Sequence, residues 1–275
     1  LLDNGRVTCW GAGTFGRLGY GNTDSIGGSD GITPATNPVN GGIVAMPGNR
    51  AVVAISAGAR HTCVILDNAT VACWGDGGDG RLGYGNISNI GDDPGETPAN
   101  NGVNGGIVAL PGGLGATAVA AGGAHTCALL TSGDVTCWGN GGSGRLGYGN
   151  LNNIGHELGN TPATNPATGG IVQLPDGHPA VAIAAGAVHT CVILQVGIVS
   201  CWGAGALGQN GLGFNEIIGD DETPAADSIV VVFGAPTAIS AGSLHTCVTM
   251  GDFGVSCWGF NEFGQLGYGN TNTIG

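Results

Sequence analysis

The sequence predicts an all-β protein built from tandem four-stranded antiparallel units, and three observations support this class. Glycine occupies 58 of the 275 positions, and because each costs about 1 kcal/mol relative to alanine in a helix, long helices are excluded. Each repeat contains four apolar runs of strand length separated by Gly, Pro, Asn and Asp. The tripeptide HTC marks the repeat and recurs at His61, His125, His189 and His245.

One complete unit shows the expected elements in order. Residues 51–58 (AVVAISAG), 61–66 (HTCVIL) and 71–75 (VACWG) are expected to form three consecutive strands, and 105–111 (GGIVALP) a fourth. The glycine-rich stretch 76–104 connects the third strand to the fourth. The period defines a single repeat domain over 1–275, made of a partial unit 1–50, complete units 51–114, 115–178 and 179–236, and an incomplete last unit 237–275.

The register of the central hairpin predicts one disulfide in each unit. If Cys63 lies opposite Cys73, Leu66 faces Thr70 and residues 67–69 form a three-residue loop. Most of the equivalent loops have glycine in third place, where the turn requires a left-handed residue. Opposed cysteines in this register stand about 5 Å apart, within disulfide reach. The predicted pairs are Cys63 with Cys73, Cys127 with Cys137, Cys191 with Cys201, and Cys247 with Cys257.

The cysteines also allow a second interpretation. His61 and Cys63 share a strand face and Cys73 lies opposite, an arrangement that suits zinc. Structural zinc cysteines are usually closer together in sequence, so the disulfide is favoured. Cys9 would pair with a residue that precedes residue 1, and we expect it to be unpaired rather than a reactive thiol. The loop 251–253 fits the common register less well than the others.

Each unit repeats one histidine and one tryptophan, and both predict structural roles. A histidine copied in every repeat is not a unique base, so we expect a ring nitrogen to satisfy backbone groups of the neighbouring loop. The tryptophans lie on the strand face opposite the cysteines and are expected to pack between adjacent sheets. These positions are His61, His125, His189 and His245, and Trp10, Trp74, Trp138, Trp202 and Trp258.

The charge of the chain excludes several partners. Six arginines and no lysine stand against nineteen acidic residues, for a net charge of −13. Such a field repels a phosphate backbone, so we expect neither nucleic acid nor an anionic membrane as a partner. No apolar stretch approaches the roughly 20 residues of a membrane span, so direct membrane insertion is not expected.

The long loops carry the candidate binding residues. Carboxylates that alternate with glycine and asparagine suit calcium, and the candidate ligands are Asp92 and Asp93 with their counterparts Asp220 and Asp221. The alternative is a solvated acidic loop without metal, because the third unit has His156-Glu157 at this position. No other cofactor is expected.

The pattern AGxxHTCxxL followed by VxCWGxxxxGRLGYG resembles the repeat of the regulator of chromosome condensation family. The resemblance covers all four units and the partial fifth, including the sequence GQLG at 264–267. It implies β-propeller blades, about seven in a complete parent, or else an open array of such units. Residues 251–275 align with 3–27, so we expect a window on a longer array. The paired cysteines resemble those of secreted or surface repeats of bacteria.

The departures from that family redirect the expected function. The paired cysteines and the lack of basic residues argue against nucleotide exchange on a small GTPase and against chromatin binding. Because every chemical feature is repeated and no catalytic arrangement is unique, we do not expect an enzyme. The leading hypothesis is an extracellular structural or adhesive protein of the bacterial surface that assembles head to tail into filaments. The alternative is a propeller that recognises a glycan or protein partner through its long loops.

Overall fold

The computed structural model describes residues 1–28, 31–251 and 254–275, and its strands form four antiparallel sheets. Each sheet is a meander whose strand order follows the sequence. The strands are β1 (Val52–Ala57), β2 (His61–Leu66) and β3 (Val71–Gly75); β4 (Ala116–Ala121), β5 (His125–Leu130) and β6 (Val135–Gly139); β7 (Ala180–Ala185), β8 (His189–Leu194), β9 (Val199–Gly203) and β10 (Ile229–Val230); and β11 (Pro236–Ala241), β12 (His245–Met250) and β13 (Val255–Gly259).

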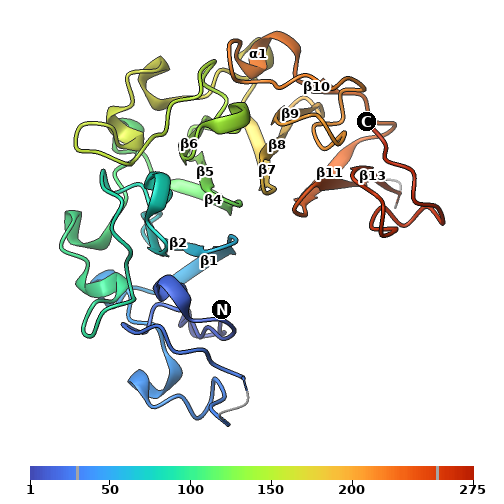
Figure 1. The fold of residues 1–275 in the computed structure, drawn as a ribbon. Helices are drawn as coiled ribbons and strands as arrows, with labels where there is room; N and C mark the ends of the chain where they lie inside the picture. Colours follow the sequence, from blue (N-terminus) through green and yellow to red (C-terminus); the bar gives the residue numbers. More distant parts are fainter. Residues whose placement is uncertain (29–30, 252–253) are drawn as a thin grey trace.

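The four sheets lie one after another along an open arc, with β1, β4, β7 and β11 on its inner side (Figure 1). Neighbouring inner strands contact one another. The long connections form the outer part of the arc. This arrangement confirms the predicted all-β architecture of propeller blades.

The long connections contain only short helices because glycine and proline interrupt them. The α-helix α1 spans Pro224–Asp227. The 3-10 helices span Thr14–Gly16, Val39–Gly42, Pro47–Asn49, Gly78–Gly80, Pro98–Asn100, Asn104–Gly106, Pro111–Gly113, Gly142–Gly144, Pro162–Thr164, Thr168–Gly170 and Pro175–Gly177.

The predicted fourth strand is much shorter than expected. In the second unit it is reduced to a single bridge between Val71 and Val108, and in the fourth unit to the two residues of β10. Gly106 has a left-handed φ of 81°, and the chain enters a 3-10 helix at Pro111. A glycine and a proline on either side leave too few residues for an extended ladder.

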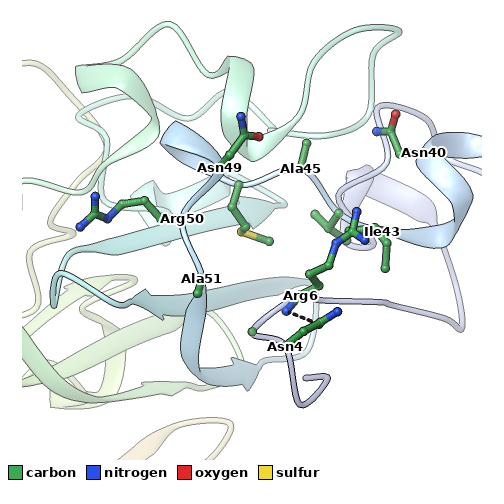
Figure 2. Close-up of a pocket in the computed structure, with 11 residues that line it drawn as sticks. Asn4, Arg6, Asn40, Ile43, Ala45, Asn49, Arg50 and Ala51 are labelled. Atoms are coloured by element: carbon green, nitrogen blue, oxygen red, sulfur yellow. Dashed lines mark hydrogen bonds between the residues drawn. The ribbon is translucent and has the colours of Figure 1, made fainter.

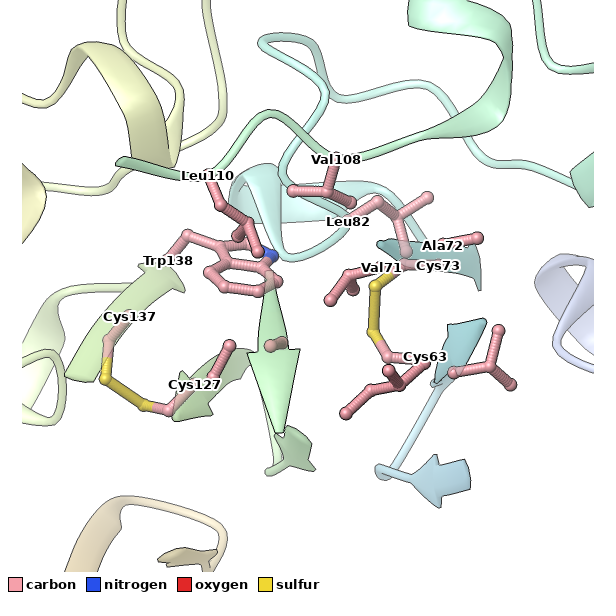
Figure 3. Close-up of a cluster of buried hydrophobic side chains, with 14 of the residues drawn as sticks. Cys63, Val71, Ala72, Cys73, Leu82, Val108, Leu110, Cys127, Cys137 and Trp138 are labelled. Atoms are coloured by element: carbon pink, nitrogen blue, oxygen red, sulfur yellow. A yellow bond between two sulfur atoms is a disulfide. The ribbon is translucent and has the colours of Figure 1, made fainter. Parts of the chain in front are cut away.

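The core lies between successive sheets. All residues of β2 and β3 are buried, because one face of the sheet packs on the preceding unit and the other on the following one. Figure 3 shows Trp138 beside Leu110 and Val108 of the preceding unit, with one disulfide on each side of this cluster. Burial of such apolar surface contributes roughly 25 cal/mol per Å², which makes these layers the main source of stability.

Candidate functional site

The four disulfides confirm the register predicted for the hairpins. Cys63 pairs directly with Cys73 across β2 and β3, with a Cα separation of 4.1 Å. The loop before β3 turns as expected, since Ala69, in third place, has φ 65°. The remaining bonds join Cys127 to Cys137, Cys191 to Cys201, and Cys247 to Cys257. In the last loop, residues 252–253 lie outside the described residues.

Cys9 is a free thiol, as expected. Burial raises its pKa to about 11. A thiol is nucleophilic only as the thiolate, so Cys9 is unreactive at neutral pH.

The repeated histidines connect neighbouring units through a hydroxyl group. The Nε2 of His61 donates to Thr126 Oγ1 at 2.8 Å, and Thr126 donates in turn to the carbonyl of Arg81 at 2.9 Å. His125 and His189 contact Thr190 and Thr246 of the following units in the same way, at 3.0 and 2.8 Å. The threonine side chain therefore stands between the imidazole and the loop carbonyl.

The environments of His61, His125 and His189 favour the neutral imidazole. Burial, together with the positive charge of Arg81, lowers the pKa of His61 to about 3. Burial likewise lowers the pKa of His189 to about 4, and that of His125 well below its ordinary value. The imidazoles are structural hydrogen-bond donors here, and the cysteines that a zinc site would need are held in disulfides.

The tryptophans also belong to these contacts between neighbouring units, which we call joints, and each is paired across the hairpin with the linking threonine. The Nε1 of Trp74 donates to the carbonyl of Arg17 at 3.0 Å, and Trp202 donates to that of Arg145 at 3.0 Å. Trp258 reaches the equivalent carbonyl of Gln209 at 3.2 Å. Trp138 occupies the same position, although its indole N–H has no partner among the described residues. Trp10 is 63% exposed.

Glycines allow the long loops of neighbouring units to touch backbone to backbone. A Cβ added at Gly80 would lie 2.3 Å from the carbonyl carbon of Gly155, and one at Gly144 would lie 2.7 Å from that of Gly219. No side chain fits there, which explains why the loops keep glycine at these positions.

The predicted calcium ligands lie in two acidic turns. In the fourth unit, Asp220, Asp221 and Glu222 bring one oxygen each within 4.8 Å of the others. In the second unit Asp92 accepts a hydrogen bond from Asn89, at 2.7 Å, and Asp93 follows it at the exposed tip of the turn.

A glutamate in each acidic turn also has a structural partner. Glu96 accepts a hydrogen bond from the amide of Gly91 at 3.1 Å, and Glu222 accepts one from Gly219 at 3.0 Å. Burial and the neighbouring carboxylates raise the pKa of both glutamates. The turns are therefore held together by their own hydrogen bonds, and calcium binding stays a prediction.

The inner strands end at a small opening at the centre of the arc. The opening has a volume of about 250 Å³ and is lined by 57–59, 121–123, 185–187 and 241–243. Its walls are joined by backbone bonds between units, such as Ala59 N–H to Gly122 O at 3.1 Å. Because these residues are small, the opening offers main-chain groups and little side-chain chemistry.

Two arginines bond to residues that line this opening, Arg60 directly follows one of these residues, and Arg81 occupies the same repeat position as Arg17 and Arg145. Arg17 donates to the carbonyl of Ala59, and Arg145 to that of Ala187, each at 3.2 Å. The guanidinium groups of Arg17 and Arg60 both stack over the ring of Phe15, at 5.7 and 5.2 Å. We call Phe15, Arg17, Arg60, Arg81 and Arg145 the arginine rim.

Only one of the three equivalent rim arginines is neutralised. Arg81 lies 3.2 Å from both Asp76 and Asp79. Around Arg17 and Arg145 the same two positions hold Ala12 and Phe15, or Asn140 and Ser143. Neither Arg17 nor Arg145 forms an ion pair among the residues that the structure describes. Arg60, which lies 3.9 Å from Asp76, and Arg17 are the accessible cations of the rim, whereas Arg81 and Arg145 are buried.

Sequence reasoning missed the rim and the threonine links. Thr126 and its counterparts were visible as the middle residue of HTC, and the arginines as part of GRLGYG. The sequence signal for the rim is that Asp76 and Asp79, which precede Arg81, are replaced by uncharged residues before Arg17 and Arg145.

The fold and the joints define a β-propeller repeat protein in which the second to fifth units each contain one disulfide. Two models described as regulator of chromosome condensation (RCC1) repeat match residues 4–65, and 52–81 with 116–145. The chain belongs to this repeat family. Within the described residues, no helix has the length and apolar character needed to cross a membrane.

Known proteins support the same assignment. The chain is 33% identical over 223 residues to the ultraviolet-B receptor UVR8 of Arabidopsis thaliana, covering 80% of this chain and 44% of that receptor. It therefore spans less than half the length of that relative. In fold it resembles human WBSCR16 (TM-score 0.66, 18% identity, 96% of this chain and 60% of that one). It also resembles yeast RCC1 (Prp20) in its complex with Kap60 (TM-score 0.64, 20% identity, 96% and 55%).

Proposed function

We propose that this chain is a non-enzymatic, extracellular binding module that recognises an acidic segment of a protein partner through the arginine rim. The rim is the observation that carries the proposal, because the accessible Arg17 and Arg60 lie together over the exposed Phe15 on an otherwise acidic chain. Opposite charge on two surfaces favours encounter and selects the partner.

The composition of the rim suits a protein interface. Arginine and aromatic side chains are enriched among residues that contribute most to protein binding. Phe15 is 37% exposed between its two arginines, and the Arg60 side chain is 56% exposed. Yeast RCC1, which shares the fold, was solved bound to a protein.

The extracellular location is supported by the four disulfides. Such bonds persist in oxidising compartments and are rare in the cytosol. Free-thiol counting under denaturing conditions should detect one thiol, Cys9, before reduction and all nine cysteines after it. A count of nine thiols before reduction would contradict an oxidising location.

The binding proposal is tested with a fluorescent oligoglutamate peptide as the probe. We expect binding that weakens with added salt, and a loss of at least about tenfold in affinity in Arg60→Glu. Phe15→Ala should weaken binding without changing charge. Gln195→Glu adds a negative charge at an exposed loop position outside the rim and serves as the control. Equal binding by wild type and Arg60→Glu would overturn the proposal.

A second candidate function is a structural or adhesive protein of the bacterial surface that assembles head to tail. It is favoured by two exposed surfaces: Trp10 is exposed, and a Cβ added at Gly264 or Gly267, the counterparts of Gly80 and Gly83, would meet none of the described residues within 4 Å. A second copy that docks there would repeat the joint seen within the chain. Light scattering should then show concentration-dependent oligomers that Trp10→Ala abolishes. A monomer at all concentrations would exclude this candidate.

A further inference from the structure

A cavity of about 620 Å³ lies in the first unit, away from the arginine rim. Figure 2 shows Arg6 rising from the first hairpin beside Ile43, with Asn40 and Asn49 at the cavity edge. Arg50 lies on the far side. The floor is apolar and includes Val44 and Met46, both buried. This volume is within the range of small-molecule sites.

The other units act as internal controls for this cavity. Where the first unit has Arg6, the second, third and fourth have Thr70, Asp134 and Ile198. Where it has Asn49, the next two have glycine. Repeated positions serve the scaffold, so polar side chains that appear in one unit only are free of that role. Because Arg6 and Asn49 both line this cavity, we interpret it as a ligand-binding site.

The Arg6 side chain is available to a ligand. The structure shows no hydrogen bond or ion pair for its guanidinium among the described residues, whereas Arg50 pairs with Asp67 at 2.7 Å. Asn49 has a left-handed φ of 54°, at a position where the following units use Gly113 and Gly177. An amide is thus placed at the cavity edge where the backbone geometry favours glycine.

These groups together fit a carboxylated sugar. A free guanidinium binds a carboxylate through two parallel hydrogen bonds. Each asparagine amide offers both a donor and an acceptor, which matches neighbouring sugar hydroxyls. The apolar floor suits the C–H face of a pyranose ring. We propose that the cavity binds a uronate residue, a site separate from the protein-binding rim and independent of that proposal.

Two variants that copy other repeats test the site without threatening the fold. Arg6→Thr reproduces the second unit and removes the cation, and Asn49→Gly reproduces the glycine of the second and third. By calorimetry with trigalacturonate, we expect Arg6→Thr to lose at least about tenfold in affinity and Asn49→Gly to lose less. Arg60→Glu, which alters only the rim, should bind as wild type.

Three further probes identify the ligand class. Galacturonic acid alone should bind more weakly than the trisaccharide if the site takes a residue within a polysaccharide, and equally if it takes the free acid. Neutral maltotriose should bind at least about tenfold more weakly than trigalacturonate. Equal binding of maltotriose, equal binding of inorganic phosphate, or unchanged affinity in Arg6→Thr would each overturn the proposal.

Discussion

The joints between units are built from residues that recur in every repeat, whereas the candidate binding surfaces depend on residues that change from repeat to repeat. At the joints the same threonine and tryptophan positions recur, the threonine donates to the carbonyl of an arginine or glutamine, and in three joints a histidine bonds the threonine. Around the rim arginines and in the cavity the equivalent positions differ from unit to unit, as with Asp79 and Ser143 at the rim and Arg6 and Asp134 at the cavity. Repetition therefore marks what holds the array together, and variation marks what it can recognise.

The largest test of the joints is acid. Because the pKa of His61 is lowered to about 3 and that of His189 to about 4, the folded state binds protons more weakly than the unfolded state. As pH falls below about 6.5 the unfolded chain protonates first, so folding stability falls by on the order of 5 kcal/mol by about pH 4 and continues to fall to about pH 3. Melting curves across this range measure the loss. His178→Gln removes a histidine outside the joints and is the control, which should lose stability as the wild type does. A wild-type melting temperature that does not change over this pH range would contradict neutral, buried histidines in the joints.

Backbone contact between loops is tested at two glycines of similar φ. Gly80 (φ 79°) has the backbone of Gly155 where a side chain would be, whereas Gly95 (φ 83°) has open space among the described residues. We expect Gly80→Ala to lower the free energy of unfolding by about 3 kcal/mol, and Gly95→Ala by about 1 kcal/mol through backbone strain alone. Urea titration measures both. Equal decreases in the free energy of unfolding for the two variants would show that the close approach of the loops does not contribute to stability.

The threonine link is expected to have a somewhat smaller effect. Thr126→Val keeps the shape but removes the hydroxyl between His61 and the carbonyl of Arg81, leaving two buried polar groups unsatisfied. The expected cost is about 2 kcal/mol. The matched change Thr117→Val, at an exposed strand position, should stay within about 0.5 kcal/mol. Chemical denaturation of both variants provides the comparison.

The smallest effect concerns the acidic turns. If Asp220, Asp221 and Glu222 hold calcium, millimolar calcium should stabilise the fold by about 1 kcal/mol, and Glu222→Gln should remove that gain. Glu157→Gln, in the unit that lacks the aspartate pair, is the control. Identical melting in calcium and in chelator would leave the turns as solvated loops closed by their own hydrogen bonds.

Several features could be predicted because they depend on residues close in sequence. The cysteine pairs follow from a three-residue loop between two strands, so the register needs no knowledge of other units. The fourth strand could not be judged in this way. Its apolar pattern suggests a strand, but the flanking Gly106 and Pro111 end it after one bridge.

The sequence by itself determined the repeat, the strands within each unit, the disulfides and the overall acidity, because these follow from local pairing and composition. Only the tertiary structure decided that His61 reaches Thr126 of the next unit, that Arg81 is neutralised while Arg145 is not, and that Arg6 meets an open cavity. The physical reason is that these contacts depend on how one sheet stacks on the next, and spacing along the chain does not specify that stacking.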